Sequence, residues 1–159
     1  MLLDAAGEPL VLSYVDRGFP IDRVAVAPTP TGGLIVHTAI MNALTPIWLI
    51  DWHEATGTFG EPVALSAPQF QGYGPIAATA VGSTVAVAYA ENGDASSPFR
   101  IGIDLLTDGK PTTHFDLPAA GLVDEIALLG SPYETALLVG YATADEQLRV
   151  LRLDCIGAL

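Results

Sequence analysis

The sequence predicts an all-β fold built from three four-stranded repeats. Three octets share one pattern: "GGLIVHTA" at 32–39, "STVAVAYA" at 83–90 and "TALLVGYA" at 135–142. Each is a short run rich in Val, Leu, Ala and Tyr with turn-forming residues around it, which is typical of a strand. Turns of the form Gly-x-Pro recur at 7–9, 60–62 and 109–111. A repeat of about 50 residues with no helical periodicity indicates a repeated β architecture.

The expected strands follow one another in the same order in each unit, within a single repeat domain covering residues 1–159. Each unit opens at its Gly-x-Pro turn, and the units span about 7–54, 60–106 and 109–154. After the first turn, "LVLSYV" at 10–15 is expected to form an outer, fourth strand that completes the last sheet, either within the same chain or in a second copy. The first, second and third strands are expected at 22–27, 32–39 and 46–51 in unit one, at 75–80, 83–90 and 99–104 in unit two, and at 124–129, 135–142 and 149–154 in unit three.

Side chains within each octet alternate between the two faces of a strand. Val85, Val87 and Tyr89 share one face, and Ala86 and Ala88 lie on the other. Aligning the octets letter by letter places Leu34, Val36 and Thr38, and also Leu137, Val139 and Tyr141, on the large face. Both faces are apolar, so we expect each sheet to pack its large face against the small face of the next sheet.

This pattern resembles the β-propeller repeat superfamily over nearly the whole chain, without matching a specific family. The WD40 Gly-His and Trp-Asp pairs are missing, and Gly32-Gly33, which a kelch repeat would show in every unit, occurs once. The sialidase turn is also absent, since "DWHEATGTFG" and "DLLTDGK" both depart from it. The resemblance therefore implies a fold and transfers no catalytic residue.

Three units are fewer than the four to eight blades of a closed propeller. Because the sequence starts its first unit with a fourth strand and ends its last with a third, two chains are expected to associate head to tail as a six-bladed ring. A fragment of a longer propeller is the second interpretation. A β-trefoil or β-prism is the third, since both also use three four-stranded units, although their strands would be buried more on one side than these octets indicate.

The charge balance excludes several partners. Eighteen acidic residues against six basic ones give a net charge of −12, which repels nucleic acid and anionic lipid surfaces. No apolar run reaches the length of a membrane span, and the N-terminal residues do not form a signal-peptide pattern, so a cytoplasmic location is expected. Cys155 is the only cysteine, which excludes an internal disulfide and favours a bystander thiol.

Candidate ligand-binding residues lie in loops expected to share one rim of the fold. The segment "SAPQFQGYGP" at 66–75 combines amides and aromatic rings on a Gly-Pro frame, a composition suited to a sugar or a peptide. An ordinary rim loop whose aromatic rings cap the core is the favoured interpretation. The residues chosen as candidates from this loop and its neighbours are Gln69, Phe70, Gln71, Tyr73, Asp16, Arg17, Asn92 and Asp94.

Metal binding and catalysis have weaker signals. Acidic residues of the same rim could surround a calcium ion, but no segment has calcium-loop spacing, and no metal or other cofactor is expected. His37, His53 and His114 fall in different positions, and His37 is expected to face the next sheet as a core histidine. Trp48 and Trp52 share a strand face with Ile50, which indicates core between sheets or an interface. No Gly-x-Ser-x-Gly motif occurs. The acidic rim residues are Asp16, Asp22, Glu91, Asp94, Asp124, Asp145 and Glu146.

These observations favour a non-enzymatic binding or scaffolding module, self-associating and lectin-like, that presents rim loops to a protein or a carbohydrate. Two alternatives remain. A glycan-acting propeller enzyme or subunit would place two rim carboxylates roughly 5 to 10 Å apart. A purely structural repeat protein would have no pocket at the rim.

Overall fold

The computed structural model describes residues 21–39, 46–65, 73–91, 99–131, 136–145 and 147–154, and in them the chain forms three antiparallel sheets and no helix. Sheet 1 contains β1 (Ile21–Thr29), β2 (Gly32–Ala39), β3 (Ile47–His53), β4 (Thr58–Phe59) and β5 (Val63–Ala64). Sheet 2 contains β6 (Tyr73–Val81), β7 (Thr84–Glu91), β8 (Arg100–Thr107) and β9 (Lys110–Pro118). Sheet 3 contains β10 (Val123–Gly130), β11 (Leu137–Thr143) and β12 (Leu148–Leu153). The all-β prediction is confirmed.

Each sheet runs in chain order from its first strand outward, as the repeat predicts. In sheet 2 the strand after the Gly-x-Pro turn, β9, pairs with β8 along its length. In sheet 1 the matching strand is broken: β4 and β5 both pair with β3, on either side of residues 60–62. Pro62, which has no N–H to donate to the ladder, lies at this break, and Pro111 at the same place in the turn of sheet 2 lies at a register shift between β8 and β9. Segment 10–15, the expected fourth strand of another sheet, lies outside the described residues.

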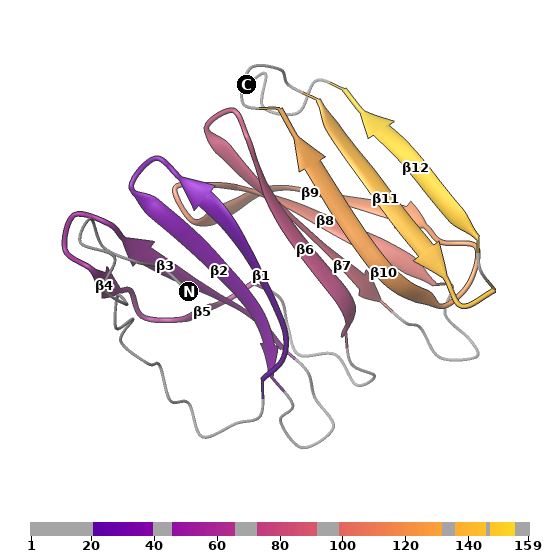
Figure 1. The fold of residues 1–159 in the computed structure, drawn as a ribbon, viewed down its shortest axis with the longest axis horizontal. Helices are drawn as coiled ribbons and strands as arrows, with labels where there is room; N and C mark the ends of the chain where they lie inside the picture. Colours follow the sequence, from indigo (N-terminus) through magenta and orange to yellow (C-terminus); the bar gives the residue numbers. More distant parts are fainter. Residues whose placement is uncertain are drawn as a thin grey trace, which may run out of the picture.

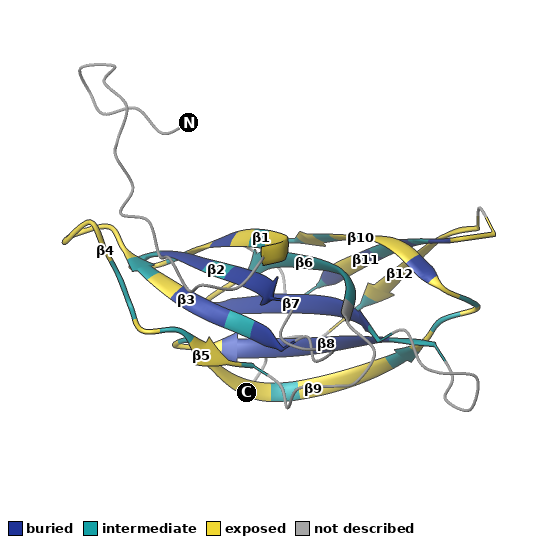
Figure 2. Ribbon diagram, turned by 90° about the horizontal axis from the view of Figure 1, so that it is seen from below, coloured by how far each residue is buried: buried dark blue, intermediate teal, exposed yellow. Residues whose placement is uncertain are grey.

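The three sheets stack face to face, with their first strands β1, β6 and β10 side by side along one edge (Figure 1). Sheet 2 is the middle layer and is covered on both faces, by two separate hydrophobic clusters. Figure 2 shows the result: β7 and β8 are buried over most of their length, whereas β9 and β12 are mostly exposed. A stack with two cores is blade-like, and it differs from three sheets around one shared core.

Sheets 2 and 3 meet as the octets predict. Tyr141 and its neighbours on the same face of β11 pack against the alanine face of β7, and all of them are buried. At Gly130 the two backbones approach so closely that an added Cβ would lie 2.1 Å from the carbonyl oxygen of Ala80. Small side chains on one sheet therefore allow large ones on the next to fill the gap. The large face consists of Leu137, Val139 and Tyr141, and the small face of Ala86, Ala88 and Ala90.

Sheets 1 and 2 meet differently from the prediction. The large face of β7, including Val87, packs against Leu34 and Val36 rather than against the face with Ile35 and His37. The first strand of sheet 1 leaves room for the large side chains of β7, because it contributes only the small residues Ala25 and Ala27 to this core. Large side chains of β7 therefore pack against small side chains of β1 and not of β2.

The cause is a one-residue error in the predicted alignment of the octets. Both hairpins have two-residue turns, since Thr29 pairs with Gly32 and Val81 pairs with Thr84. Counting from these turns, Leu34 corresponds to Ala86 and not to Val85. A shift of one residue moves every side chain of a strand to the other face. Consequently His37 lies on the face of sheet 1 that points away from sheet 2, which corrects the expectation that it faces the next sheet.

Two sheet faces therefore form the ends of the stack. The outer face of sheet 1 holds the two tryptophans and Ile50, which the sequence had placed between sheets, together with exposed valines of β1. The outer face of sheet 3 holds small residues of β11 and exposed aliphatic side chains of β10 and β12. The first face comprises Val24, Val26, Ile35, His37, Trp48, Ile50 and Trp52, and the second comprises Glu125, Ala127, Leu129, Leu138, Gly140, Ala142, Leu148, Val150 and Arg152.

Candidate functional site

Most of the predicted rim residues cannot be placed. Gln69, Phe70, Gln71, Asp16, Arg17, Asn92 and Asp94 lie outside the described residues. Tyr73 begins β6, and its backbone pairs with that of Glu91. The rim therefore stays a prediction. Three other features of the described structure are candidates for function: a polar network on sheet 2, a cavity between sheets 1 and 2, and the outer faces of sheets 1 and 3.

A chain of polar side chains crosses the outer strands of sheet 2. The buried Asp104 of β8 accepts a hydrogen bond from the Tyr89 hydroxyl at 2.9 Å and lies 2.9 Å from Nδ1 of His114 on β9. Nε2 of His114 lies 3.2 Å from Asp116, which also contacts Arg100 at 3.6 Å. Arg100 is paired in turn with Glu91. Cross-strand register aligns these groups, because residues opposite one another in neighbouring strands share a face.

The electrostatics of this network favour protonated His114. Partial burial lowers the pKa of His114, but the hydrogen bonds and negative charges of Asp104 and Asp116 outweigh burial and raise the pKa above its ordinary value. The hydrogen bond to Glu91 likewise raises the pKa of Arg100. Tyr89 is buried and its hydroxyl is engaged by Asp104, so the network offers no activated nucleophile. It neutralises a buried carboxylate and fixes the packing of Tyr89.

The alternating pattern of "RIGIDLLT" could have revealed this network. Asp104 is an acidic residue in the middle of an otherwise apolar strand, and such a residue needs a partner when buried. Its partners come from β7 and β9, and the pairing register that joins them is a property of the folded sheet.

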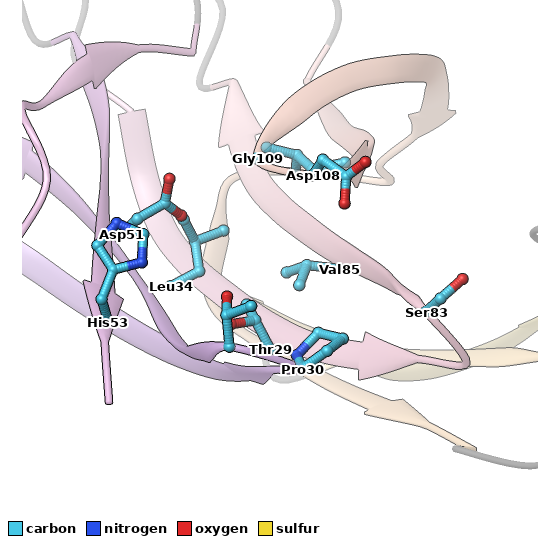
Figure 3. Close-up of a pocket in the computed structure, with 11 residues that line it drawn as sticks. Thr29, Pro30, Leu34, Asp51, His53, Ser83, Val85, Asp108 and Gly109 are labelled. Carbon is cyan, nitrogen blue, oxygen red and sulfur yellow. The ribbon is translucent and has the colours of Figure 1, made fainter. Parts of the chain in front are cut away.

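A polar cavity of about 210 Å³ opens between sheets 1 and 2, at the end of the strands opposite to the predicted rim (Figure 3). Asp51 and His53 reach it from β3, and Asp108 and Gly109 reach it from the turn between β8 and β9. The backbone of Asp108 is left-handed, with φ 50°, which brings this turn over the opening. The hairpin turns at 30–31 and 82–83 complete the mouth of the cavity, and Leu34, Val85 and Leu106 form its apolar floor.

This cavity lacks the features of a metal centre. Asp51 and His53 are exposed, and within the described residues no group of three His, Cys, Asp or Glu side chains is arranged to hold a metal ion. The three histidines lie apart: His37 on the outer face of sheet 1, His53 at this cavity, and His114 in the network of sheet 2. In the described part of the chain there is also no helix long and apolar enough to cross a membrane.

The outer faces of sheets 1 and 3 are the most unusual surfaces of the molecule. Val24 and Val26 on sheet 1 are 57% and 63% exposed, and Leu148 and Val150 on sheet 3 are 75% and 63% exposed. Sheet 1 also carries a hollow of about 410 Å³ beside β1, lined largely by apolar groups. Exposed apolar side chains that gather on one face make that face a candidate interaction site. The hollow is lined by Val26, Ala27, Pro28, Gly32, Gly33, Ile35, Trp52 and Phe59.

The two tryptophans of β3, which the sequence singled out, lie on the outer face of sheet 1. Trp48 and Trp52 were expected either in the core between sheets or at an interface, and both lie partly buried on the outer face. The hairpin geometry of sheet 1 places them outside the core between sheets 1 and 2, because it turns Leu34 and Val36 toward sheet 2 and the tryptophans away from it.

Comparison of the chain with protein-family models and with curated proteins finds no match in either.

Proposed function

We propose that this protein is a non-enzymatic binding or scaffolding module that works as a ring of two copies, associated head to tail through the outer faces of sheets 1 and 3. The ring presents its rim loops to a protein or a carbohydrate. The observation that supports this most strongly is that both ends of the stack carry exposed aliphatic side chains, at β1 on sheet 1 and at β10 and β12 on sheet 3.

The repeat explains why these two faces would fit each other. Sheet 2 turns its β7 face with Val87 toward sheet 1, and sheet 3 turns its β11 face with Val139 toward sheet 2. Equivalent faces therefore point the same way along the stack. Continuing the stack by one step would place the outer face of sheet 1 against the outer face of sheet 3 of a second copy. Such heterologous contacts form rings when their rotation closes.

The side chains of the two faces are complementary in size. Sheet 1 offers the partly buried Trp48 and Trp52, whereas β11 of sheet 3 offers Gly140 and Ala142 beside the exposed Leu138. This is the same arrangement of large against small that joins sheets 2 and 3. Burial of apolar area contributes about 25 cal/mol per Å², which gives these surfaces a driving force for association.

The net charge of each copy opposes association and provides a first test. Two chains of charge −12 repel each other, and salt screens that repulsion over about 10 Å at 0.1 M. Light scattering during size exclusion should give a mass of twice 16.5 kDa, with a dissociation constant that falls as salt rises. A mass of 16.5 kDa at all salt concentrations and at high protein concentration would disprove the ring.

Point variants locate the interface. Val26→Arg on sheet 1 and Val150→Arg on sheet 3 each place a charge on an outer face and should yield monomers, because a buried unpaired charge is costly. Leu122→Arg is the matched control, since Leu122 is also exposed but lies in the connection between β9 and β10. Equal loss of the dimer in all three variants would contradict the assignment of the outer faces.

Variants of the predicted rim loop at 66–75 test the binding role. An oligosaccharide panel should show binding by the dimer that is lost in a Gln69→Ala, Gln71→Ala double variant, because these amides are the expected hydrogen-bond donors of the 66–75 loop. Turnover of glycosides by the same preparation would instead support the glycan-acting alternative.

A further inference from the structure

The hollow on the outer face of sheet 1 has a filled counterpart on sheet 2. Counting from the two-residue turns, Gly33 corresponds to Val85, and the residues paired with them are Trp52 and Leu106. Val85 and Leu106 are buried in one core together with Leu34 of sheet 1. Gly33 and Trp52 instead line the hollow of about 410 Å³. The hollow is therefore the surface on which another sheet would pack, as sheet 1 packs on sheet 2.

One row of side chains on sheet 1 covers that counterpart. Ala27, Leu34 and Asp51 are paired in turn across β1, β2 and β3, so they lie in line on one face of the sheet. Ala27 and Leu34 belong to the core with sheet 2. Asp51 reaches the turn between β8 and β9, where a Cβ added at Gly109 would lie 3.2 Å from its Oδ2. The row therefore contacts both the apolar surface and the third turn of the neighbouring sheet.

Sheet 3 carries the equivalent row on its outer face. Leu129, Leu138 and Arg152 are paired in turn across β10, β11 and β12. Leu138 has the same place in its octet as Ala86, which in turn corresponds to Leu34. Leu129 is 65% exposed and Leu138 is 37% exposed, whereas the first two residues of the row on sheet 1 are buried. This row is thus ready to cover a surface equivalent to that of sheet 2.

We propose that Leu129 and Leu138 of one copy fill the hollow on sheet 1 of a second copy, and that Arg152 of the same row meets Glu54 of that copy. Glu54 lies in the turn between β3 and β4, which has the place of the turn at Gly109 in sheet 2. This inference rests on the proposed ring, and it names the side chains that join the two copies.

The sizes of these residues are complementary. Gly33 contributes no side chain to the hollow, at the place where sheet 2 has Val85. Leu129 has the place that the small Ala27 occupies in the equivalent row. The row of sheet 3 therefore carries more apolar volume than the row of sheet 1, and the hollow provides the room for it.

The charges of the two copies are complementary at the third turn. A carboxylate at this place in the row, such as Asp51 of sheet 1, would be repelled by Glu54, whereas the guanidinium of Arg152 attracts it. Arg152 donates a hydrogen bond from Nε to Asp154 at 2.6 Å. A guanidinium has five N–H donors, so Arg152 can bind the carboxylate of Glu54 beside that of Asp154.

The head-to-tail ring allows a test with a single kind of chain. Each interface of the ring contains sheet 1 of one copy and sheet 3 of the other, so a chain with two substitutions changes both sides of every interface. Within one chain these sheets lie at opposite ends of the stack, two sheet spacings or about 20 Å apart (Figure 1). Substitutions on sheets 1 and 3 should therefore have additive effects unless the copies bring them into contact.

Charge reversal tests the ion pair. The dissociation constant of the dimer, measured by sedimentation, should rise about tenfold or more in Glu54→Arg and in Arg152→Glu, because each variant brings two like charges together. The chain with both substitutions keeps the net charge of −12 and should return to within about threefold of the unchanged chain. Without this rescue, Arg152 does not meet Glu54.

A volume exchange tests the hollow. Gly33→Val should weaken the dimer about tenfold, since its side chain takes the space of a leucine, and Leu138→Ala should weaken it by loss of buried apolar area. On the Leu138→Ala background, Gly33→Val should cost less than about twofold. The monomer should keep its urea midpoint in Gly33→Val, because an added Cβ lies 3.6 Å from its nearest neighbours. Leu122→Ala, at an exposed leucine between β9 and β10, is the control and should leave the dimer unchanged.

Two results would overturn the inference. If the unchanged chain forms the dimer but the effects of Gly33→Val and Leu138→Ala simply add, Leu138 does not dock in the hollow, although the ring stands. If the unchanged chain stays a monomer at every protein concentration, the ring itself is refuted. Failure of the inference is thus distinguished from failure of the proposed function.

Discussion

Gly102 of β8 is the position where a single methyl group should be most informative. It lies opposite Tyr89 on β7, and the tyrosine ring crosses over it to reach Asp104. A Cβ added at Gly102 would lie 2.5, 2.7 and 2.9 Å from Cε2, Cζ and the hydroxyl oxygen of Tyr89. The ring is buried between sheets 1 and 2 and cannot swing into solvent. Gly102→Ala must therefore displace Tyr89.

Two costs add up in this variant. Overpacking a core typically costs about 1–3 kcal/mol. Loss of the hydrogen bond from Tyr89 leaves the buried Asp104 with one partner fewer, at about 1–3 kcal/mol. The free energy of unfolding should fall by roughly 2–6 kcal/mol in total. Urea unfolding followed by the fluorescence of Trp48 and Trp52 measures it, since both tryptophans lie in sheet 1, which packs against this ring.

A double-mutant cycle tests the reason for the loss. Tyr89→Leu removes the three ring atoms that clash and keeps an apolar side chain in the core, so Gly102→Ala on that background should cost less than about 0.5 kcal/mol. If Gly102→Ala costs the same on both backgrounds, the clash with the ring is not the cause. In that case, the backbone of β8 must need glycine for another reason.

Three further predictions concern other contacts. Gly130→Ala should destabilise the fold by about 3 kcal/mol or more in the same urea assay, because its Cβ meets the β6 backbone, which cannot rotate away as a side chain can. Protonated His114 stabilises the fold, since its pKa is raised by Asp104 in the folded state; this contribution is full below pH about 6.5, the unfolded value, and is lost as pH rises through the folded pKa. His114→Gln should remove that pH dependence from urea midpoints measured between pH 5 and 9, and an unchanged profile would contradict the assignment. Thr38→Val should cost about 1 kcal/mol, because the Thr38 hydroxyl accepts the backbone N–H of Arg23 at 3.1 Å where the register of β1 shifts; a smaller loss in Thr38→Ser would confirm the hydroxyl as the cause.

Local pattern was sufficient for the strands of this protein. Period-two runs between Gly, Pro and Asp predict β1, β6 and β10 within two residues at each end, because a strand needs only its own alternation and two boundaries. The two-residue turns at Pro30-Thr31 and Gly82-Ser83 were not predicted, and the second strand of unit two was expected to begin at Ser83, which the structure places in the turn. The division of the fourth strand of sheet 1 into β4 and β5 was not predicted. No residue before position 60 indicates how many residues of β3 the following segment pairs with.

The local pattern could not decide which face of a strand points toward the neighbouring sheet. In sheet 1, Leu34 and Ile35 are equally apolar, so the octet itself does not say which of them points to sheet 2. The predicted alignment chose the wrong equivalence, and it placed Leu34 and Val36 on the face that corresponds to Val85 and Val87. An amphipathic strand would have fixed its own orientation, but a strand covered on both faces has no polar side to reveal it.

The candidate functional features also differ in how far the sequence alone could predict them. The rim residues predicted from composition lie largely outside the described residues, and the outer faces and the network of Asp104 emerge from residues that the chain places far apart. The sequence by itself determined that the chain makes strands, that they form three units, and where most of them lie to within about two residues, because those properties depend on neighbouring residues. The tertiary structure decided which face of each sheet is inside, because that depends on how one sheet stacks on the next, and it thereby left two apolar faces at the ends of the stack.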